Sequence, residues 1–139
     1  MSQQTSGRVV QIIGPVVDIG FPDGHLPAIL NAVHIADEGD AGQMAIDVTV
    51  EVALHLGENR ARCIAMEPTD GMVRGMKAID LGEPISVPVG RQTLGRVLGV
   101  LGEPVDGRGP VETEERLPIH REPPPLSEQS TETLSLIHI

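Results

Sequence analysis

Phosphate-binding chemistry has one candidate in this sequence, the cluster Gly71-Met-Val-Arg-Gly75-Met-Lys77-Ala78. A phosphate-binding loop needs the pattern G-x-x-x-x-G-K-[ST], because its backbone N–H groups cradle the phosphates, its lysine reaches them and its hydroxyl holds Mg²⁺. The cluster has the wrong spacing and lacks the Ser or Thr. The chain has no other Gly/Lys cluster, so the sequence predicts no phosphate-binding loop within it.

Metal chemistry is suggested by five histidines. No pair of them has the helical i, i+4 spacing of metal ligands, and only one cysteine accompanies them. His34 and His55 could meet across neighbouring strands, but solvent-facing positions are the better interpretation. The acidic run Asp37-Glu38-Gly39-Asp40 lacks the alternating ligands and the terminal Glu of a calcium loop, so it is interpreted as a solvated loop.

Acid–base and nucleophilic chemistry have two further candidates. Glu112, Glu114 and Glu115 could pair as catalytic carboxylates, but nothing places a substrate near them, so a solvated turn or subunit contact is favoured. Cys63 could be a nucleophile, although a lone cysteine is more often a small buried hydrophobe. One cysteine also excludes an intrachain disulfide, which fits a reducing compartment.

Composition narrows the class of protein. The 139 residues are 40% hydrophobic but contain one aromatic side chain, Phe21, so the core must be aliphatic. The net charge of −10 argues against binding to nucleic acid or anionic lipid, both of which need clustered cations. No apolar run approaches the ~20 residues of a membrane span. The start of the chain has neither a hydrophobic signal region nor an Arg-rich presequence, which predicts the cytoplasmic side of a bacterial cell.

The elements that must position these residues are mainly strands. Short apolar runs separated by Gly, Pro and Asn turns predict strands at 7–13, 16–19, 29–35, 46–54 and 60–66. Residues 72–79 are expected to form a last short strand or an irregular crossing. The clearest pattern is at 46–54, where apolar residues alternate with Asp47, Thr49, Glu51, Ala53 and His55, which predicts one buried and one wet face. Strands at this spacing predict a small closed barrel of about six strands.

A different pattern follows Gly82-Glu-Pro84, which marks a predicted domain boundary. Residues 85–89 are predicted to form a short strand broken by Pro88. Leu94, Val97, Leu98 and Leu101 fall on one helical face, with Thr93 as the N-cap and Gly102 and Pro104 at the end. Prolines keep most of the remaining chain extended.

Several long motifs occur in one order along the chain. They are Gly7-Arg-Val-Val-Gln-Ile-Ile-Gly-Pro-Val-Val-Asp18, Thr69-Asp-Gly-Met-Val-Arg-Gly75, Ile85-Ser-Val-Pro-Val-Gly90, Leu94-Gly-Arg-Val97, Leu101-Gly-Glu-Pro-Val-Asp106 and Glu114-Glu-Arg-Leu-Pro-Ile-His-Arg121. On these motifs, residues 7–134 resemble the N-terminal part of the catalytic β subunits of F-type ATP synthases.

The resemblance implies a specific architecture and activity. Residues 1–81 are expected to form the barrel that joins neighbouring barrels in a collar above a hexamer. Residues 82–134 are expected to begin an α/β RecA-like nucleotide-binding domain. The partners implied are α subunits alternating around the hexamer and the central-stalk γ subunit. The full-length family member binds ATP or ADP with Mg²⁺, couples proton transport to ATP synthesis, and lies peripherally on the cytoplasmic face of the bacterial inner membrane.

The tail departs from this family. Residues 135–139 do not continue its pattern, so they are interpreted as a non-native end. The chain stops before the family's phosphate-binding loop, so it is expected to bind no nucleotide or metal and to have no catalytic residues, leaving only the assembly barrel. His120-Arg121 could touch phosphate, but packing or an inter-subunit contact is the favoured role. The alternatives are a related rotary or secretion ATPase subunit, and a stand-alone protein-binding barrel.

Overall fold

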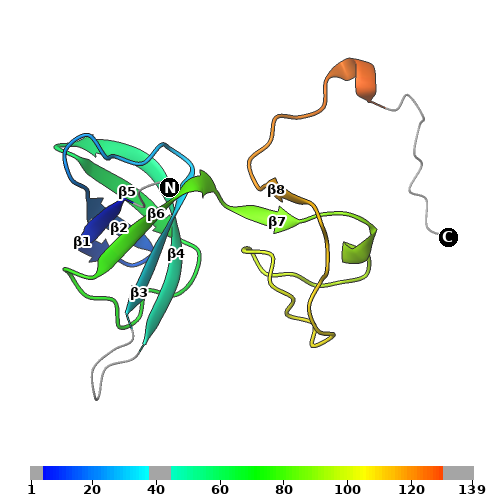
Figure 1. Cartoon of the computed structure of the whole chain (residues 1–139), viewed down its shortest axis with the longest axis horizontal. Helices are drawn as coiled ribbons and strands as arrows, with labels where there is room; N and C mark the ends of the chain where they lie inside the picture. Colours follow the sequence, from blue (N-terminus) through cyan, green and yellow to red (C-terminus); the bar gives the residue numbers. More distant parts are fainter. Residues whose placement is uncertain (1–4, 38–44, 130–139) are drawn as a thin grey trace.

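The computed structural model describes residues 5–37 and 45–129, and its main feature is a closed antiparallel barrel (Figure 1). The strands are β1 (Ser6–Ile13), β2 (Val16–Gly20), β3 (Asn31–Asp37), β4 (Ile46–Gly57), β5 (Arg60–Ala65) and β6 (Lys77–Pro84). They pair in the order β1-β2-β5-β4-β3-β6, and the barrel closes where β6 pairs with β1. The predicted fold class, mainly β with a closed six-strand barrel, is confirmed.

The residues after the barrel, 85–129, are called the arm. Figure 1 shows β6 continuing almost directly into β7 (Ser86–Pro88), which pairs with β8 (Arg116–Pro118). Two short 3₁₀ helices, η1 (Arg91–Thr93) and η2 (Leu126–Glu128), complete the arm. The strand expected at 85–89 is therefore present as β7. That the arm opens a RecA-like domain stays a prediction.

The barrel core is aliphatic, as the composition predicts. Its fully buried members are mostly β-branched residues, whose stiff side chains suit a pleated wall. Phe21, the single aromatic residue, is also buried in this core. Backbone packs closely beside it, because a Cβ added to Gly7 would lie 2.6 Å from the Gly20 carbonyl oxygen and 2.8 Å from the Phe21 ring. The largest fully buried side chains are those of Ile19, Ile35, Val17, Val33, Val50, Val52 and Cys63.

The alternation predicted for β4 holds only for part of the strand. Val48, Val50 and Val52 are buried, but a bulge between Val52 and Leu54 shifts the register, and Leu54 is 43% exposed. An extra residue in one strand turns the following side chains to the other face. The expectation of a wet Glu51 is also wrong, since this residue is only 8% exposed.

The helix predicted over 94–101 is wrong. The only helical turn in this region is η1, and Leu98 instead forms an isolated bridge with Pro104. Gly95, inside the predicted helix, has a φ of 72°, which no α-helix contains. Leu94 is 77% exposed and Val97 is 59% exposed, so half of the predicted apolar face is not packed. Without such packing a short, glycine-containing helix is not stable.

One strand start differs from expectation. β3 begins at Asn31 rather than at 29, because Leu30 has a φ of 74° and belongs to a turn. Hydrophobicity patterns do not report such a positive backbone angle. Residues 72–79 contain both forms expected for them, since an irregular segment that includes Gly75, with a φ of 91°, precedes β6, which begins at Lys77.

A charged pair joins two neighbouring strands of the barrel wall. Asp18 on β2 lies opposite Arg62 on β5, and the guanidinium donates to both carboxylate oxygens at 2.8 Å. Asp18 is only 6% exposed. The hydrogen bonds from Arg62, opposed by desolvation, hold the pKa of Asp18 below its ordinary value of 3.8.

Removing side-chain volume from the core tests the packing. Ile19→Ala should lower the free energy of unfolding by about 2–5 kcal/mol, because the side chain is fully buried and leaves a cavity. Ile13→Ala is the matched control: its side chain is 58% exposed, and the expected loss is about 0.5 kcal/mol or less. Chemical denaturation of both variants measures this, and equal losses would contradict the core assignment.

The Asp18–Arg62 pair predicts a pH dependence of stability. Because the folded-state pKa of Asp18 is depressed, its contribution is present above the ordinary pKa of 3.8 and is lost as pH falls through the folded value. Asp18→Asn should therefore be less stable than the unchanged chain at pH 7, with the gap narrowing below about pH 4. Thermal melts across pH, with the exposed Asp70→Asn as control, measure the gap. A gap that stays constant would refute the prediction.

Candidate functional site

A side-chain hydrogen bond joins the arm to the outside of the barrel. His120 Nε2 lies 2.8 Å from Glu51 Oε2, with side-chain exposures of 47% and 11%. The two residues are 69 positions apart in sequence: Glu51 belongs to the barrel and His120 to the arm. This contact explains why Glu51, in a wall position that water would otherwise reach, is buried.

The strand register places Glu51 on the outer surface. Its neighbours Val50 and Val52 point into the core, so Glu51 points outward. Ala32 on β3 lies directly opposite Glu51 and is only 3% exposed. Ile85, at the start of the arm, is 4% exposed. Two outward-facing barrel residues and the first arm residue are therefore covered together, which defines an interface between barrel and arm.

A small cavity of about 260 Å³ lies within this interface. Ala32 and Thr49 line it from the barrel, and Ile85, Leu101 and Arg116 line it from the arm. Its size and mixed lining make it a packing gap between the two parts of the chain rather than a substrate site of ordinary size.

The β7–β8 ribbon holds His120 in position. The Ile119 N–H donates to the Ile85 carbonyl oxygen at 2.9 Å, which extends the β7–β8 pairing to the residue before His120. Arg116 on β8 donates to the carbonyl oxygens of Ser86 at 2.7 Å and Leu101 at 3.3 Å. These bonds limit the conformations that the backbone beside His120 can adopt. The imidazole therefore loses little further conformational freedom when it contacts Glu51.

A second charged pair organises the loop of the arm. Arg96 Nε lies 2.7 Å from Asp106 Oδ2, and the side chains are 14% and 9% exposed. Asp106 also accepts from the backbone N–H groups of Val97 at 3.2 Å and Arg108 at 3.1 Å. The hydrogen bonds from Arg96, followed by those from the two backbone groups, hold the pKa of Asp106 far below its ordinary value despite the opposing effect of desolvation.

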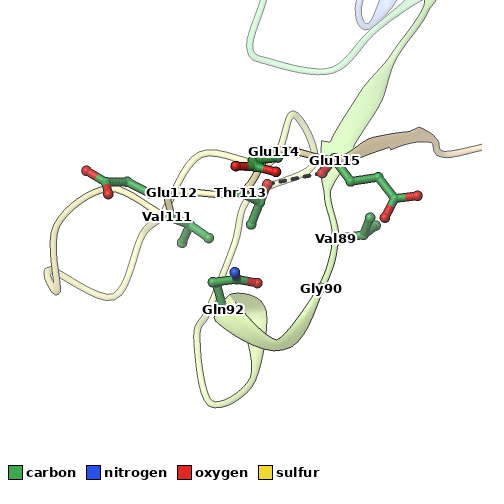
Figure 2. A pocket seen from close by; sticks show the side chains of 8 residues that line it. All are labelled: Val89, Gly90, Gln92, Val111, Glu112, Thr113, Glu114 and Glu115. Atoms are coloured by element: carbon green, nitrogen blue, oxygen red, sulfur yellow. Dashed lines mark hydrogen bonds between the residues drawn. The ribbon is translucent and has the colours of Figure 1, made fainter.

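The three glutamates proposed as catalytic carboxylates line an open groove of about 720 Å³ with Val89, Gly90 and Gln92 (Figure 2). In Figure 2 the carboxylates of Glu112 and Glu115 point away from each other. The hydrogen bond drawn there joins the Thr113 hydroxyl to the Glu115 carbonyl oxygen at 3.1 Å and involves no carboxylate. Glu112 and Glu115 are therefore not brought together as an acid–base pair.

The histidines considered for metal binding lie apart in separate contacts. His34 Nε2 is 2.7 Å from Asp47 Oδ1, while His55 Nε2 is 2.8 Å from the Pro27 carbonyl oxygen. Across residues 5–37 and 45–129, no three His, Cys, Asp or Glu side chains are grouped to hold a metal ion. Of the acidic run, only Asp37 is described, at the end of β3, and residues 38–40 lie outside the described residues.

Cys63 is a core residue, as its favoured interpretation predicts. It is fully buried on β5, and desolvation, with a contribution from Asp18, raises the pKa of its thiol to about 12. A nucleophilic cysteine needs a lowered pKa and exposure, so this thiol is inert. The 71–78 cluster also serves the barrel: the Gly75 N–H donates to the Val9 carbonyl oxygen at 2.8 Å.

Comparison with known proteins gives the barrel a family. The family model described as ATP synthase alpha/beta family, beta-barrel domain, matches residues 9–82, which is more than half of the 139 residues. The chain belongs to the ATP synthase alpha/beta family. The match runs from within β1 into β6, so the six strands described above make up the family barrel. The described residues contain no helix long and apolar enough to cross a membrane.

The sequence did not predict the roles of three residues in the interface and the arm. The alternation of β4 predicts that Glu51 lies on the solvent-facing side of the strand. The sequence around Glu51 does not show that another segment of the chain covers this residue. Arg96 and Asp106 are ten positions apart, and their pairing depends on the turn between Leu98 and Pro104. The only available signal was that the motifs containing both residues belong to the family resemblance.

The contact between Glu51 and His120 should limit opening of the arm. Glu51→Gln and His120→Gln should each speed amide exchange in β8 and at Ile119 without changing exchange in the barrel strands, because the ribbon loses its charged anchor. In a double-mutant cycle on the free energy of opening of the arm, the two side chains should be coupled by about 0.5–1 kcal/mol, which lies within the range for exposed pairs. Hydrogen exchange measured by mass spectrometry, with exposed His25→Gln as control, tests this. Unchanged exchange in β8 would contradict it.

Proposed function

We propose that this chain is the N-terminal part of the catalytic β subunit of an F-type ATP synthase, and that its barrel is an assembly module. The observation that supports this most directly is the closed six-strand family barrel with its outer wall carrying an anchored arm. A closed barrel has no free strand edge. Such a domain therefore contacts neighbours through side chains on its wall.

The choice of the catalytic subunit over its α partner depends on short motifs. Thr69-Asp-Gly71, Val73-Arg-Gly75 and Pro118-Ile-His120-Arg121 resemble those of the catalytic subunit. His120, the most distinctive of these residues, contacts Glu51 on the barrel. That contact supports a role for the motif in joining the barrel to the segment that follows it.

The chemistry of the full-length family member is proposed to use ATP or ADP with Mg²⁺ in a domain that follows the arm. Phosphoryl transfer depends on a phosphate-binding backbone, its lysine and the metal ion. The 139 residues contain no G-x-x-x-x-G-K-[ST] pattern. We therefore infer that this chain contributes assembly and no ATP synthesis or hydrolysis of its own.

Its proposed partners are α subunits alternating with it around a hexamer and the γ subunit of the central stalk. Its proposed location is the cytoplasmic face of the bacterial inner membrane, where the complex couples proton transport to ATP synthesis. A related rotary or secretion ATPase would share the barrel but assemble with different neighbours. A stand-alone binding barrel would assemble with neither.

Calorimetric titration tests the assembly role and the lack of nucleotide binding together. The full chain should bind the α subunit of a bacterial F-type ATP synthase, because the barrel is proposed to dock in its collar. In the same buffer it should give no heat with Mg-ATP in the micromolar range, because it lacks the phosphate-binding loop.

Each possible failure has its own meaning. Micromolar binding of Mg-ATP would overturn the inactive-chain proposal. If circular dichroism shows that the barrel is folded and the chain still does not bind the α subunit, the assembly proposal is overturned. Binding instead to the corresponding subunit of a related rotary ATPase would favour that alternative.

A further inference from the structure

The hydrogen bond between Glu51 and His120 differs from the other buried carboxylate contacts in the kind of partner it uses. Asp18 and Asp106, two other carboxylates with little exposure, are each held by an arginine, at 2.8 Å and 2.7 Å. A guanidinium is not deprotonated in proteins. An imidazole ordinarily gains or loses its charge between about pH 5 and pH 8. Of these three contacts, the one that joins the barrel to the arm is therefore the one whose partner changes charge.

Glu51 has no second partner that could replace His120. In the described part of the chain, its carboxylate makes no hydrogen bond or ion pair other than the one with His120, at 2.8 Å. Its cross-strand neighbours are Ala32 on β3 and Ile64 on β5, whose side chains carry no polar atom. A carboxylate that is shielded from water and from other donors is sensitive to the charge of its single partner.

The charged side chains around this contact come from each element packed against it. They are Glu83 on β6, Glu67 after β5, Arg62 on β5, His34 on β3, Arg116 on β8, and Arg121 and Glu122 beside His120. Carboxyl groups ordinarily titrate near about pH 4, so above about pH 5.5 the imidazoles are the groups of this set that change charge. His34 is bonded within the barrel wall to Asp47, at 2.7 Å.

His120 lies where the β7–β8 ribbon leaves the barrel. The Ile119 N–H donates to the Ile85 carbonyl oxygen at 2.9 Å, and Ile85 directly follows β6. The cavity of about 260 Å³ beside Ile85 leaves the packing between barrel and arm incomplete there. A contact at this position therefore limits the movement of the whole ribbon with less support from packing than a core contact has.

We propose that the Glu51–His120 contact is a pH-sensitive latch between the barrel and the arm. A protonated imidazole adds the attraction of opposite charges to the hydrogen bond. A neutral imidazole lacks that attraction, and it donates to Glu51 only in the tautomer that has the proton on Nε2. The arm therefore opens more often as the pH rises through the range in which an imidazole loses its proton. By linkage, closing the arm and binding this proton favour each other.

Hydrogen exchange across pH tests the latch in the full chain. Exchange in β8 and at Ile119 is measured by mass spectrometry from about pH 5.5 to about pH 8, and each rate is divided by the intrinsic rate of the unfolded sequence at that pH. Relative to β5, the protection of β8 should fall roughly two- to fivefold across this range, as expected for the loss of a partly exposed ion pair. His120→Gln and Glu51→Gln should each remove this fall. His34→Gln is the control and should keep it.

Each contrary outcome overturns the latch. If the protection of β8 falls equally in His120→Gln, another group governs the opening of the arm. If the unchanged chain shows no fall while β5 stays protected, the charge of the imidazole does not govern it. The latch consists of contacts within this chain, and neither nucleotide nor α subunit is present in the experiment. Its failure therefore leaves the proposed function standing, and a failure of α-subunit binding leaves the latch standing.

Discussion

The β1–β6 seam is the constraint on which the rest of this structure depends. Three residue pairs, from Ser6–Ile79 to Arg8–Lys77, join the first strand to the last and turn an open sheet into a closed wall. Closure removes strand edges and leaves each side chain facing either the core or the outside. Glycine at position 7 permits this seam, because a side chain there would collide with the backbone and ring of residues 20 and 21.

Once the wall is closed, its outer face is divided between different uses. One region, around Glu51 and Ala32, is covered by the arm and is held by a charged contact at 2.8 Å. Another, on the β1 side, has a hollow lined by Arg60 and Arg74. The two regions share no lining residue, so the arm leaves the hollow on the β1 side uncovered. Neither the Glu51–His120 contact nor the two arginines of this hollow belongs to the buried core of the barrel.

Much of the barrel could be predicted from sequence, but in the arm only the short strand β7 could. The strands of the barrel are bounded by turn residues and alternate clearly, so local patterns identify them. In the arm, Leu94, Val97, Leu98 and Leu101 have helical spacing, yet the glycines at 95 and 102 adopt positive φ angles and no helix forms. There the Arg96–Asp106 pair and the β7–β8 ribbon decide the path, and both join residues distant in sequence. The candidate carboxylates and histidines stayed weak candidates in the sequence, because no pattern gave them partners.

The sequence by itself predicted an aliphatic closed barrel, a chain without a phosphate-binding loop, and a single cysteine that favours the core. These follow from periodicity, motif spacing and composition, which are local properties. Only the tertiary structure decided that Glu51 is covered rather than wet, that His120 is its partner across 69 positions, and that Arg60 and Arg74 share one groove. The reason is physical: closing the barrel brings distant segments side by side, and a side chain's burial depends on which of them lies over it.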